Sequence, residues 1–364
     1  MNAITQPPIS QPFDQAEAAA FAERIGGVLD SGAVAFMLSV GHRLGLFDVL
    51  HRMPPATSAE IAGRAELAER YVREWLAVMV TARIVAYDPD AGLYTLPPEH
   101  AACLTRGAPL GNLALYGQHI AIMGAVQERV LACFESGEGT SYGDYPCFHQ
   151  VMAEDSGQTV ASQLCDVILP LGEGLTECLE AGADVLDAGC GRGGALLALA
   201  ARFPESRFVG YDLCADAIAY AAQAARAAGL ANLRFEARDL TGYDERTRFD
   251  IVTSFDAVHD QKDPECLIRS LHGALKPGGA YLMQDIGGSA RLENNLDFPM
   301  ASLLYAISCV HCTPISLGQG GAGLGTMWGW ETAEAMLRRA GFAAVERHVL
   351  PHDPMNVWFV ARKA

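Results

Sequence analysis

The chain has 364 residues, roughly twice the length of one domain of ~100–200 residues, so two domains are predicted. Half of the residues are apolar and 19% are charged, a composition that excludes a disordered, collagen-like or coiled-coil chain. Asp and Glu number 43 against 26 Lys and Arg, for a formal net charge of −17. Because an acidic chain repels phosphate backbones and no run of Lys and Arg offsets this charge, we expect no binding to nucleic acid.

The first residues, Met1 to Gln15, have neither the basic start nor the apolar centre of a signal peptide. The most apolar early stretch, 32–41, is far shorter than the ~18 residues that span a bilayer. Ten cysteines in a chain of this length lack the density of a disulfide scaffold. We therefore expect a cytoplasmic protein with reduced thiols and no membrane association.

Residues 1–100 favour three helices followed by a hairpin. Helical patterns run over 16–50, 59–65 and 69–84, and short strands are predicted around 84–87 and 93–96. This order is typical of a winged helix. The candidate recognition helix carries Glu69, Arg70, Arg73 and Glu74, whose charges cancel, whereas a groove-reading helix needs a basic flank. Dimerisation and covering of a substrate are therefore favoured over DNA binding.

Residues 101–182 are predicted to be a helical connector and substrate cover, and residues 183–364 alternate short apolar runs with helical patterns. Such alternation predicts a doubly wound, Rossmann-like α/β domain with a parallel sheet. The last two strands are separated by only a short turn, so they should form an antiparallel hairpin at the edge. The seven predicted strands are 184–186, 207–211, 233–237, 251–254, 280–284, 343–348 and 357–361.

The most informative stretch is "VLDAGCGRGG", residues 185–194, in which an apolar strand turns through glycines into a helix. Open α/β sheets bind ligands at the carboxyl ends of their strands, and glycines let the backbone approach the ligand. Gly189, Gly191 and Gly194 also satisfy G-x-G-x-x-G, the dinucleotide pattern, so an NAD-dependent oxidoreductase is an alternative.

Three aspartates distinguish the two cofactors. Asp187 directly precedes the glycines, where its charge would oppose a pyrophosphate and suit an ammonium group. Asp212 ends the next strand, placed to accept hydrogen bonds from ribose hydroxyls, and Asp239 ends the third, placed to accept from an adenine amine. S-adenosylmethionine has the ammonium, the ribose and the adenine, and it lacks phosphate.

In these features the sequence resembles the class I S-adenosylmethionine-dependent methyltransferases, whose first motif is similar to D-x-G-x-G-x-G. The segment "ALKPGGAYLMQD" is similar to that family's approach to its fifth strand. The N-terminal half resembles the winged-helix dimerisation domain of small-molecule O-methyltransferases of the caffeate type. The resemblance implies S-adenosylmethionine as cofactor, a small-molecule substrate and a homodimer. It implies that the methionine moiety is lined by Asp187, Gly189 and Gly191, the ribose by Asp212 and Leu213, and the adenine by Asp239 and Leu240, with Phe255 packed on the cofactor.

The fourth strand runs into "SFDAVHDQKDP", where His259 and Asp260 match a His-Asp pair of the plant-type enzymes. The resemblance implies that His259 deprotonates a substrate hydroxyl, a task that suits histidine near neutral pH. Gln261 replaces the tryptophan that usually follows in the family, which counts against a phenolic substrate. Hydroxyl methylation is the first expectation. The alternative is methylation of a small thioether or thiol, such as a methylthio hydroxy acid, in which His259 would orient substrate.

Residues 286–330 are long for a connection between a strand and a helix, which indicates a functional segment. Cys309 and Cys312 flank His311, but one pair supplies only two thiolates, so no metal site is predicted. The glycine-rich run 318–325 suggests a mobile lid over the site, with tryptophans as anchors. The candidate substrate contacts are Tyr142, Phe148, His311 and Trp328. A further alternative is a winged-helix regulator that senses a ligand through a methyltransferase-like domain.

Overall fold

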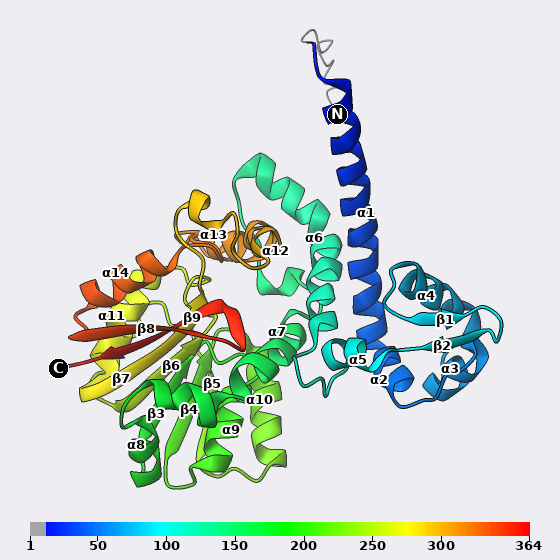
Figure 1. Cartoon of the computed structure of the whole chain (residues 1–364). Coiled ribbons are helices and arrows are strands. Elements are labelled where there is room, and N and C mark those ends of the chain that lie inside the picture. Colours follow the sequence, from blue (N-terminus) through cyan, green and yellow to red (C-terminus); the bar gives the residue numbers. More distant parts are fainter. Residues whose placement is uncertain (1–11) are drawn as a thin grey trace. The chain divides into compact units, whose positions relative to one another are not determined.

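The computed structural model describes residues 12–364, which form two compact units that divide between Ala121 and Ile122 (Figure 1). Most of the segment on which the signal-peptide expectation rests therefore lies outside the described residues. The sequence-based boundaries after residues 100 and 182 remain a prediction.

Among the described residues, the first unit contains a long helix, four shorter α-helices, a two-stranded hairpin and a short 3-10 helix. The predicted helical stretch 16–50 is interrupted at Gly45, whose φ of 70° ends one helix and begins the next. The helix predicted over 69–84 ends earlier, at Thr81, since Arg83 takes a φ of 60°. Phe47 and Trp75 pack edge to face in the core. The elements are α1 (Gln15–Arg43), α2 (Leu46–His51), α3 (Ser58–Ala65), α4 (Glu69–Thr81), β1 (Ala86–Asp88), β2 (Leu93–Thr95), α5 (Pro98–Leu104) and η1 (Leu113–Tyr116).

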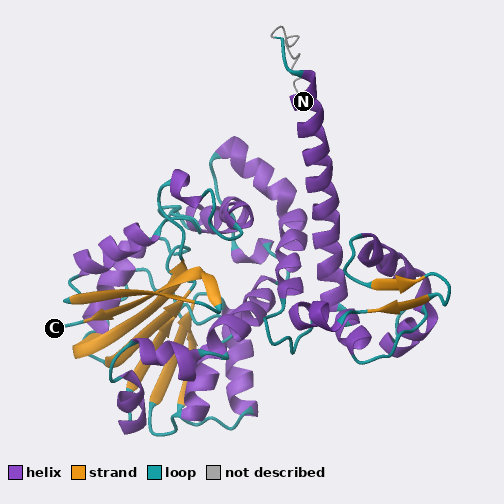
Figure 2. Ribbon diagram, in the orientation of Figure 1, coloured by secondary structure: helices purple, strands orange, loops and turns teal. Residues whose placement is uncertain are grey.

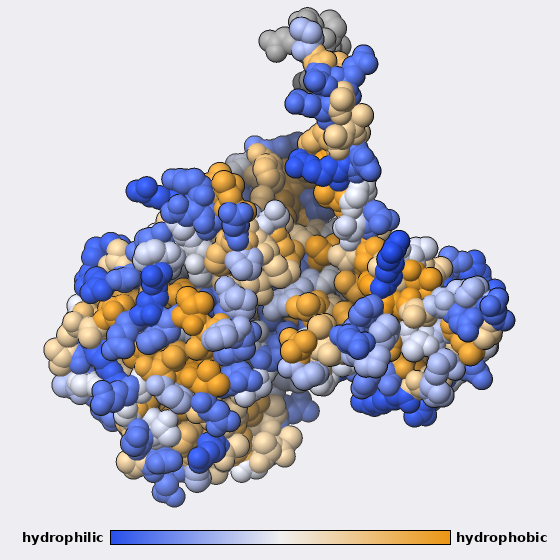
Figure 3. Space-filling view, viewed as in Figure 1, coloured by the Kyte–Doolittle hydropathy of each residue, from blue (hydrophilic) through white to orange (hydrophobic). Residues whose placement is uncertain are grey.

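Helix α1 leaves much of its apolar surface exposed, and Figure 3 shows apolar residues among charged ones along it. The exposed apolar side chains include Phe21, Val28, Leu29 and Phe36. By length and composition two helical stretches, Gln15–Arg43 and Ala301–Gly318, are long and apolar enough to cross a membrane. Core helices of soluble proteins pass the same test, so the expectation of no membrane association stays a prediction.

The second unit is built on a seven-stranded sheet in the order β5-β4-β3-β6-β7-β9-β8. The first five of these pair in parallel, and β9 pairs antiparallel with both β7 and β8. The predicted Rossmann-like sheet and its antiparallel edge hairpin are thus confirmed. The strands are β3 (Asp184–Ala188), β4 (Arg207–Asp212), β5 (Leu233–Ala237), β6 (Phe249–Phe255), β7 (Leu275–Ile286), β8 (Ala344–Leu350) and β9 (Asp353–Arg362).

Helices cover both faces of this sheet (Figure 2). Side chains of a strand alternate between the faces, so Leu186 joins a core with α11 and α14, whereas Val185 joins a second core with α8, α9 and α10. Both faces are buried, which explains the nearly continuous apolar strands. These helices are α8 (Leu175–Ala181), α9 (Gly194–Arg202), α10 (Ala215–Ala227), α11 (Pro264–Ala274) and α14 (Trp330–Ala340).

Two further helical segments lie before β3 and after β7. The Thr140 N–H donates to Pro314 O at 2.9 Å, which ties the first segment to the second. The first comprises α6 (Gly117–Ser136), η2 (Tyr142–Asp144), α7 (Phe148–Ser156), η3 (Gly157–Ala161), η4 (Leu164–Ile168) and η5 (Leu169–Leu171). The second comprises η6 (Leu292–Asn295), α12 (Ala301–Ile307), η7 (Ser308–Cys312) and α13 (Thr313–Gly318).

The glycine-rich run 318–325 is fastened to its surroundings rather than free. The Gly321 N–H donates to Ser316 O at 2.8 Å, and the Gly323 N–H donates to Ser316 Oγ at 3.0 Å. The Ala322 N–H donates to Lys262 O at 3.1 Å, which anchors the run to the loop after β6. The structure therefore gives no support to the predicted mobile lid.

Candidate active site

The turn after β3 brings backbone close to the ends of the neighbouring strands. Gly189, Gly191 and Gly193 all have positive φ, which glycine adopts without strain. A Cβ on Gly189 would lie 2.5 Å from Ala257 Cβ, and one on Gly193 would lie 2.4 Å from the Phe235 ring. Above Gly191, by contrast, an added Cβ would meet nothing within 4 Å. Glycine is thus required at two positions for close packing, while the backbone at Gly191 stays open.

Asp212, the last residue of β4, is fixed beside this turn. Its Oδ2 accepts the Gly191 N–H at 2.8 Å, and its Oδ1 accepts the Cys214 N–H at 2.8 Å. The only basic side chain of the turn, Arg192, lies over the ring of Tyr220 at 4.4 Å. We call the glycine turn and Asp212 together the cradle. It combines open backbone with an oriented carboxylate, which suits a hydroxyl-bearing ligand.

Asp187 lies beneath the turn, fully buried. Its Oδ1 accepts a hydrogen bond from Thr253 Oγ1 of β6 at 2.7 Å. Burial raises the pKa of this carboxyl to about 7, and the nearby charge of Asp212 acts in the same direction. The side chain thus contacts the sheet, and its charge would act on an ammonium group electrostatically.

The other predicted cofactor residues lie around the same strand ends. The sequence predicts that Asp239 ends the third strand, but strand β5 ends two residues earlier, at Ala237. Asp239 therefore lies in the following loop, where its Oδ1 accepts the Thr241 N–H at 2.7 Å. Leu213 is exposed, and Leu240 is buried in the first core. Phe255 packs against Trp358, with ring centroids 5.9 Å apart.

His259 is buried in the loop after β6, and carboxylates face both of its ring nitrogens. Its Nδ1 lies 2.8 Å from Asp285 Oδ1, and its Nε2 lies 3.3 Å from Asp260 Oδ1. Asp256 Oδ1 is 3.8 Å from Nδ1. Burial disfavours the charged imidazolium, but the attraction of Asp285 and Asp260 outweighs it and raises the pKa of His259 above its usual value.

Sequence reasoning missed Asp285 as a partner of this histidine. The residue lies near the carboxyl end of β7, which pairs in parallel with β6. The available signal was a carboxylate at the end of a strand adjacent to the one that precedes His259. The same Asp285 Oδ1 accepts the indole N–H of Trp328 at 2.9 Å, so Trp328 holds this carboxylate instead of anchoring a lid.

The three other predicted substrate residues converge on the opposite side, at Asp260. The hydroxyl of Tyr142 donates to Asp260 Oδ2 at 3.4 Å. The ring of Phe148 stacks on the His311 imidazole, with centroids 3.9 Å apart, and Tyr145 meets the same imidazole edge-on. The structure therefore brings the predicted catalytic and substrate residues, together with Asp256 and Asp285, into one largely buried network. We call it the His259 cluster: Tyr142, Phe148, Asp256, His259, Asp260, Asp285, His311 and Trp328.

Two family models match the chain. Residues 32–106 match an Rv2258c-like winged helix-turn-helix domain, and residues 179–341 match a methyltransferase domain. Both predicted domain types are thus confirmed.

Curated relatives resemble only part of the chain. Phosphoethanolamine N-methyltransferase 1 of Arabidopsis thaliana is 37% identical over 110 residues, which cover 29% of this chain and 22% of that protein. The fatty-acid O-methyltransferase of Mycolicibacterium smegmatis is 32% identical over 104 residues, 29% of this chain and 37% of that protein.

Solved structures cover nearly the whole chain at low identity. A crystal structure from Nostoc punctiforme described as an O-methyltransferase gives a TM-score of 0.68 at 20% identity, covering 97% of this chain and 100% of that one. Human N-acetylserotonin methyltransferase in complex with S-adenosylmethionine gives 0.66 at 16% identity, covering 98% and 100%. This likeness shows that the two-part fold is shared.

Proposed function

We propose that this chain, which contains a winged helix-turn-helix domain followed by a class I methyltransferase domain, transfers a methyl group from S-adenosylmethionine to a small molecule. The observation that carries the proposal is the Asp212 carboxylate, held by two backbone N–H groups against an open glycine turn. A fixed carboxylate can accept hydrogen bonds from ribose hydroxyls without the entropic cost of ordering a side chain.

The residues of the cradle fit the chemical groups of the cofactor. Gly189 and Gly191 would border the methionine moiety, Asp212 with Leu213 the ribose, and Asp239 with Leu240 the adenine. When bound, S-adenosylmethionine supplies an electrophilic methyl group, so the protein must mainly orient the acceptor and exclude water. An ammonium group near Asp187 would favour the ionised form of that buried carboxyl.

For the acceptor, the first candidate is a hydroxyl whose proton His259 removes. That role needs a ring nitrogen with a lone pair directed at the substrate. Asp285 faces Nδ1 and Asp260 faces Nε2, which leaves neither nitrogen directed at an open space. A substrate hydroxyl would have to displace Asp260 before His259 could act as base.

The second candidate is a sulfur atom, and the closed surroundings of His259 favour it. A thioether has no proton to lose, and a thiol loses its proton more readily than an alcohol does. In this proposal His259 and Asp260 position the acceptor, while the rings of Tyr142 and Phe148 border it. A screen of matched acceptors, in which a thioether, thiol or hydroxyl occupies the same position, tests the choice through the product formed.

We also propose that the protein is a cytoplasmic homodimer assembled through its first unit. The apolar side chains exposed along α1 need a covering surface, and a second copy of the helix would supply one. The alternative of a DNA-binding regulator is disfavoured by α4, where Arg70 pairs with Glu74 and Arg73 with Glu69. These arginines are already neutralised and offer little net charge to phosphates.

A further inference from the structure

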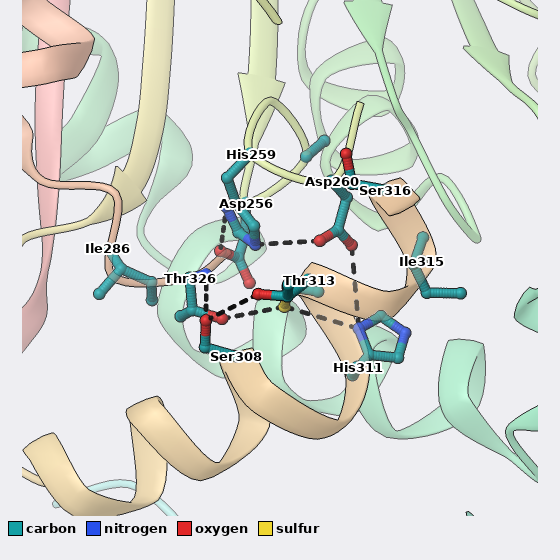
Figure 4. Close-up of polar contacts among 12 residues, drawn as sticks. Asp256, His259, Asp260, Ile286, Ser308, His311, Thr313, Ile315, Ser316 and Thr326 are labelled. Carbon is teal, nitrogen blue, oxygen red and sulfur yellow. Dashed lines mark hydrogen bonds and ion pairs between the residues drawn. The ribbon is translucent and has the colours of Figure 1, made fainter. Parts of the chain in front are cut away.

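Three side chains of types that bind metal ions meet at the edge of the His259 cluster: its members His259 and Asp260, and the neighbouring Cys312. His259 and Asp260 come from the loop after β6, and Cys312 comes from the end of η7, more than fifty residues later. All three are buried, with 2%, 6% and 4% of their surfaces exposed. One nitrogen, one oxygen and one sulfur atom of these residues lie within 4.8 Å of one another. In Figure 4, His259, Asp260 and His311 point toward one another.

We propose that His259, Asp260 and Cys312 bind a divalent metal ion of the zinc class. Tetrahedral zinc with Zn–N of ~2.05 Å, Zn–O of ~2.1 Å and Zn–S of ~2.3 Å requires ligand separations of about 3.4 Å for N–O and about 3.6 Å for N–S. His259 Nε2 and Asp260 Oδ1 are 3.3 Å apart, which matches the first separation. The nitrogen–oxygen separation thus needs little change to accept the ion, and the sulfur of Cys312 lies within 4.8 Å of both other ligand atoms.

The surroundings of these ligands support the proposal independently. Metal-binding histidines nearly always donate their other ring N–H to a carboxylate or carbonyl. Here Asp285 lies 2.8 Å from His259 Nδ1 and is itself held by Trp328, which leaves Nε2 to face Asp260. The Oδ1 atom of Asp260 is buried and accepts no hydrogen bond, although buried polar atoms nearly always have a partner; it faces only His259 Nε2, at 3.3 Å. A metal ion would satisfy this oxygen.

The donor set selects the class of ion. A thiolate with an imidazole and a single carboxylate suits zinc, whereas magnesium and calcium prefer oxygen ligands alone. Three protein ligands are typical of sites that keep a fourth position open. The nearest further donor is His311, whose Nδ1 is 3.6 Å from Cys312 Sγ and 3.9 Å from Asp260 Oδ2.

Sequence spacing could not reveal this arrangement, because the proposed co-ligands of Cys312 come from a different loop and do not include Cys309. Cys309 is exposed and takes no part in either potential metal cluster found among the described residues. The metal proposal goes beyond methyl transfer and does not depend on it, since it concerns binding of an ion to the protein without cofactor.

The test is titration of the chelator-treated full-length protein with Zn²⁺ in a calorimeter, with the metal content measured after dialysis. We expect about one equivalent of zinc per chain for the wild type and for Cys309→Ser, the matched control three residues away. Cys312→Ser should lower the affinity at least tenfold, and Asp285→Asn should lower it ~10–100-fold through loss of the carboxylate that orients His259. The proposal would be overturned if Cys312→Ser bound zinc as tightly as the wild type does, or if only Cys309→Ser lost affinity for zinc.

Cobalt substitution keeps the test decisive if Cys312→Ser does not fold. Co²⁺ added to wild-type and Cys309→Ser protein should give the intense visible bands of a tetrahedral site and a thiolate-to-cobalt charge-transfer band in the near ultraviolet. Absence of the charge-transfer band from Cys309→Ser, with the fold intact by circular dichroism, would show that Cys312 binds no metal. Neither readout involves methyl transfer, so failure here leaves the proposed activity untouched.

Discussion

The carboxylate of Asp212 accepts the backbone N–H of Gly191 at 2.8 Å, which fastens the end of β4 to the turn that follows β3. The two residues lie at the carboxyl ends of adjacent parallel strands, where open α/β sheets bind their ligands. A single carboxylate therefore both shapes the turn and offers a fixed acceptor to a ligand above it.

Replacing Asp212 should weaken binding of the cofactor product. Asp212→Ala removes charged hydrogen bonds, so the affinity for S-adenosylhomocysteine should fall by ~1–3 kcal/mol in isothermal titration calorimetry. Asp216→Ala, which changes an exposed acidic residue at the start of α10, is the matched control and should bind as the wild type does. An unchanged dissociation constant for Asp212→Ala would remove Asp212 from the site.

Asp187 should make stability depend on pH in a defined direction. Its pKa is raised to about 7 in the folded protein, against about 4 when unfolded, so the folded state holds the proton more tightly. As pH rises from about 4 to about 7, the unfolded carboxyl ionises first and stability contributed by this group is lost. The Asp187→Asn variant carries a neutral amide at this position, so it does not lose stability in this way as pH rises.

The measurement is the difference in melting temperature between Asp187→Asn and wild type at pH 5 and pH 7.5. As pH rises, the melting temperature of the variant should increase relative to that of the wild type, because only the wild type must bury a charge. Using the difference between the two proteins cancels the contributions of other titrating groups. One such group is Asp256, because burial also raises its pKa to about 7. A difference that stays constant between the two pH values would contradict the raised pKa of Asp187.

Local patterns predicted the sheet and the glycine turn well. The strands are buried on both faces, so their apolar runs are visible without any knowledge of neighbours, and the motif from Asp187 to Gly193 is contiguous. The His259 cluster could not be predicted in the same way. Its bonds join Asp260 to Tyr142, over a hundred residues earlier, and Asp285 to Trp328, across the long helical segment.

Two differences have simple physical causes. The first helix ends at Arg43 and a second begins at Leu46, because Gly45 between them adopts a positive φ, and a helical pattern alone does not mark such a break. The glycine-rich run 318–325 suggested mobility by composition, but Ser316 accepts or donates bonds that fasten it.

Acceptor chemistry should follow the closed surroundings of His259. In a screen of matched small molecules, a thioether or thiol should be methylated in preference to the hydroxyl analogue, with S-methylated product identified by mass spectrometry. For a thioether, kcat should vary little between pH 6 and pH 8, since no proton leaves the acceptor during transfer. Efficient methylation of the hydroxyl analogue alone would restore His259 as the general base.

Assembly through α1 can be separated from activity. Leu29→Glu introduces a charge into the exposed apolar surface of α1 and should convert a dimer into monomers in multi-angle light scattering. Glu23→Gln, on the same helix, alters charge without touching an apolar side chain and should leave the dimer intact. A wild-type protein that is monomeric at micromolar concentration would refute the proposed dimer.

The central claim is that the glycine turn and Asp212 bind S-adenosylmethionine, and calorimetric titration of the wild-type protein tests it most directly. S-adenosylhomocysteine should bind at one site per chain with a dissociation constant in the micromolar range, whereas NAD should produce no saturable heat. Binding of NAD without binding of S-adenosylhomocysteine would contradict the account and favour an oxidoreductase.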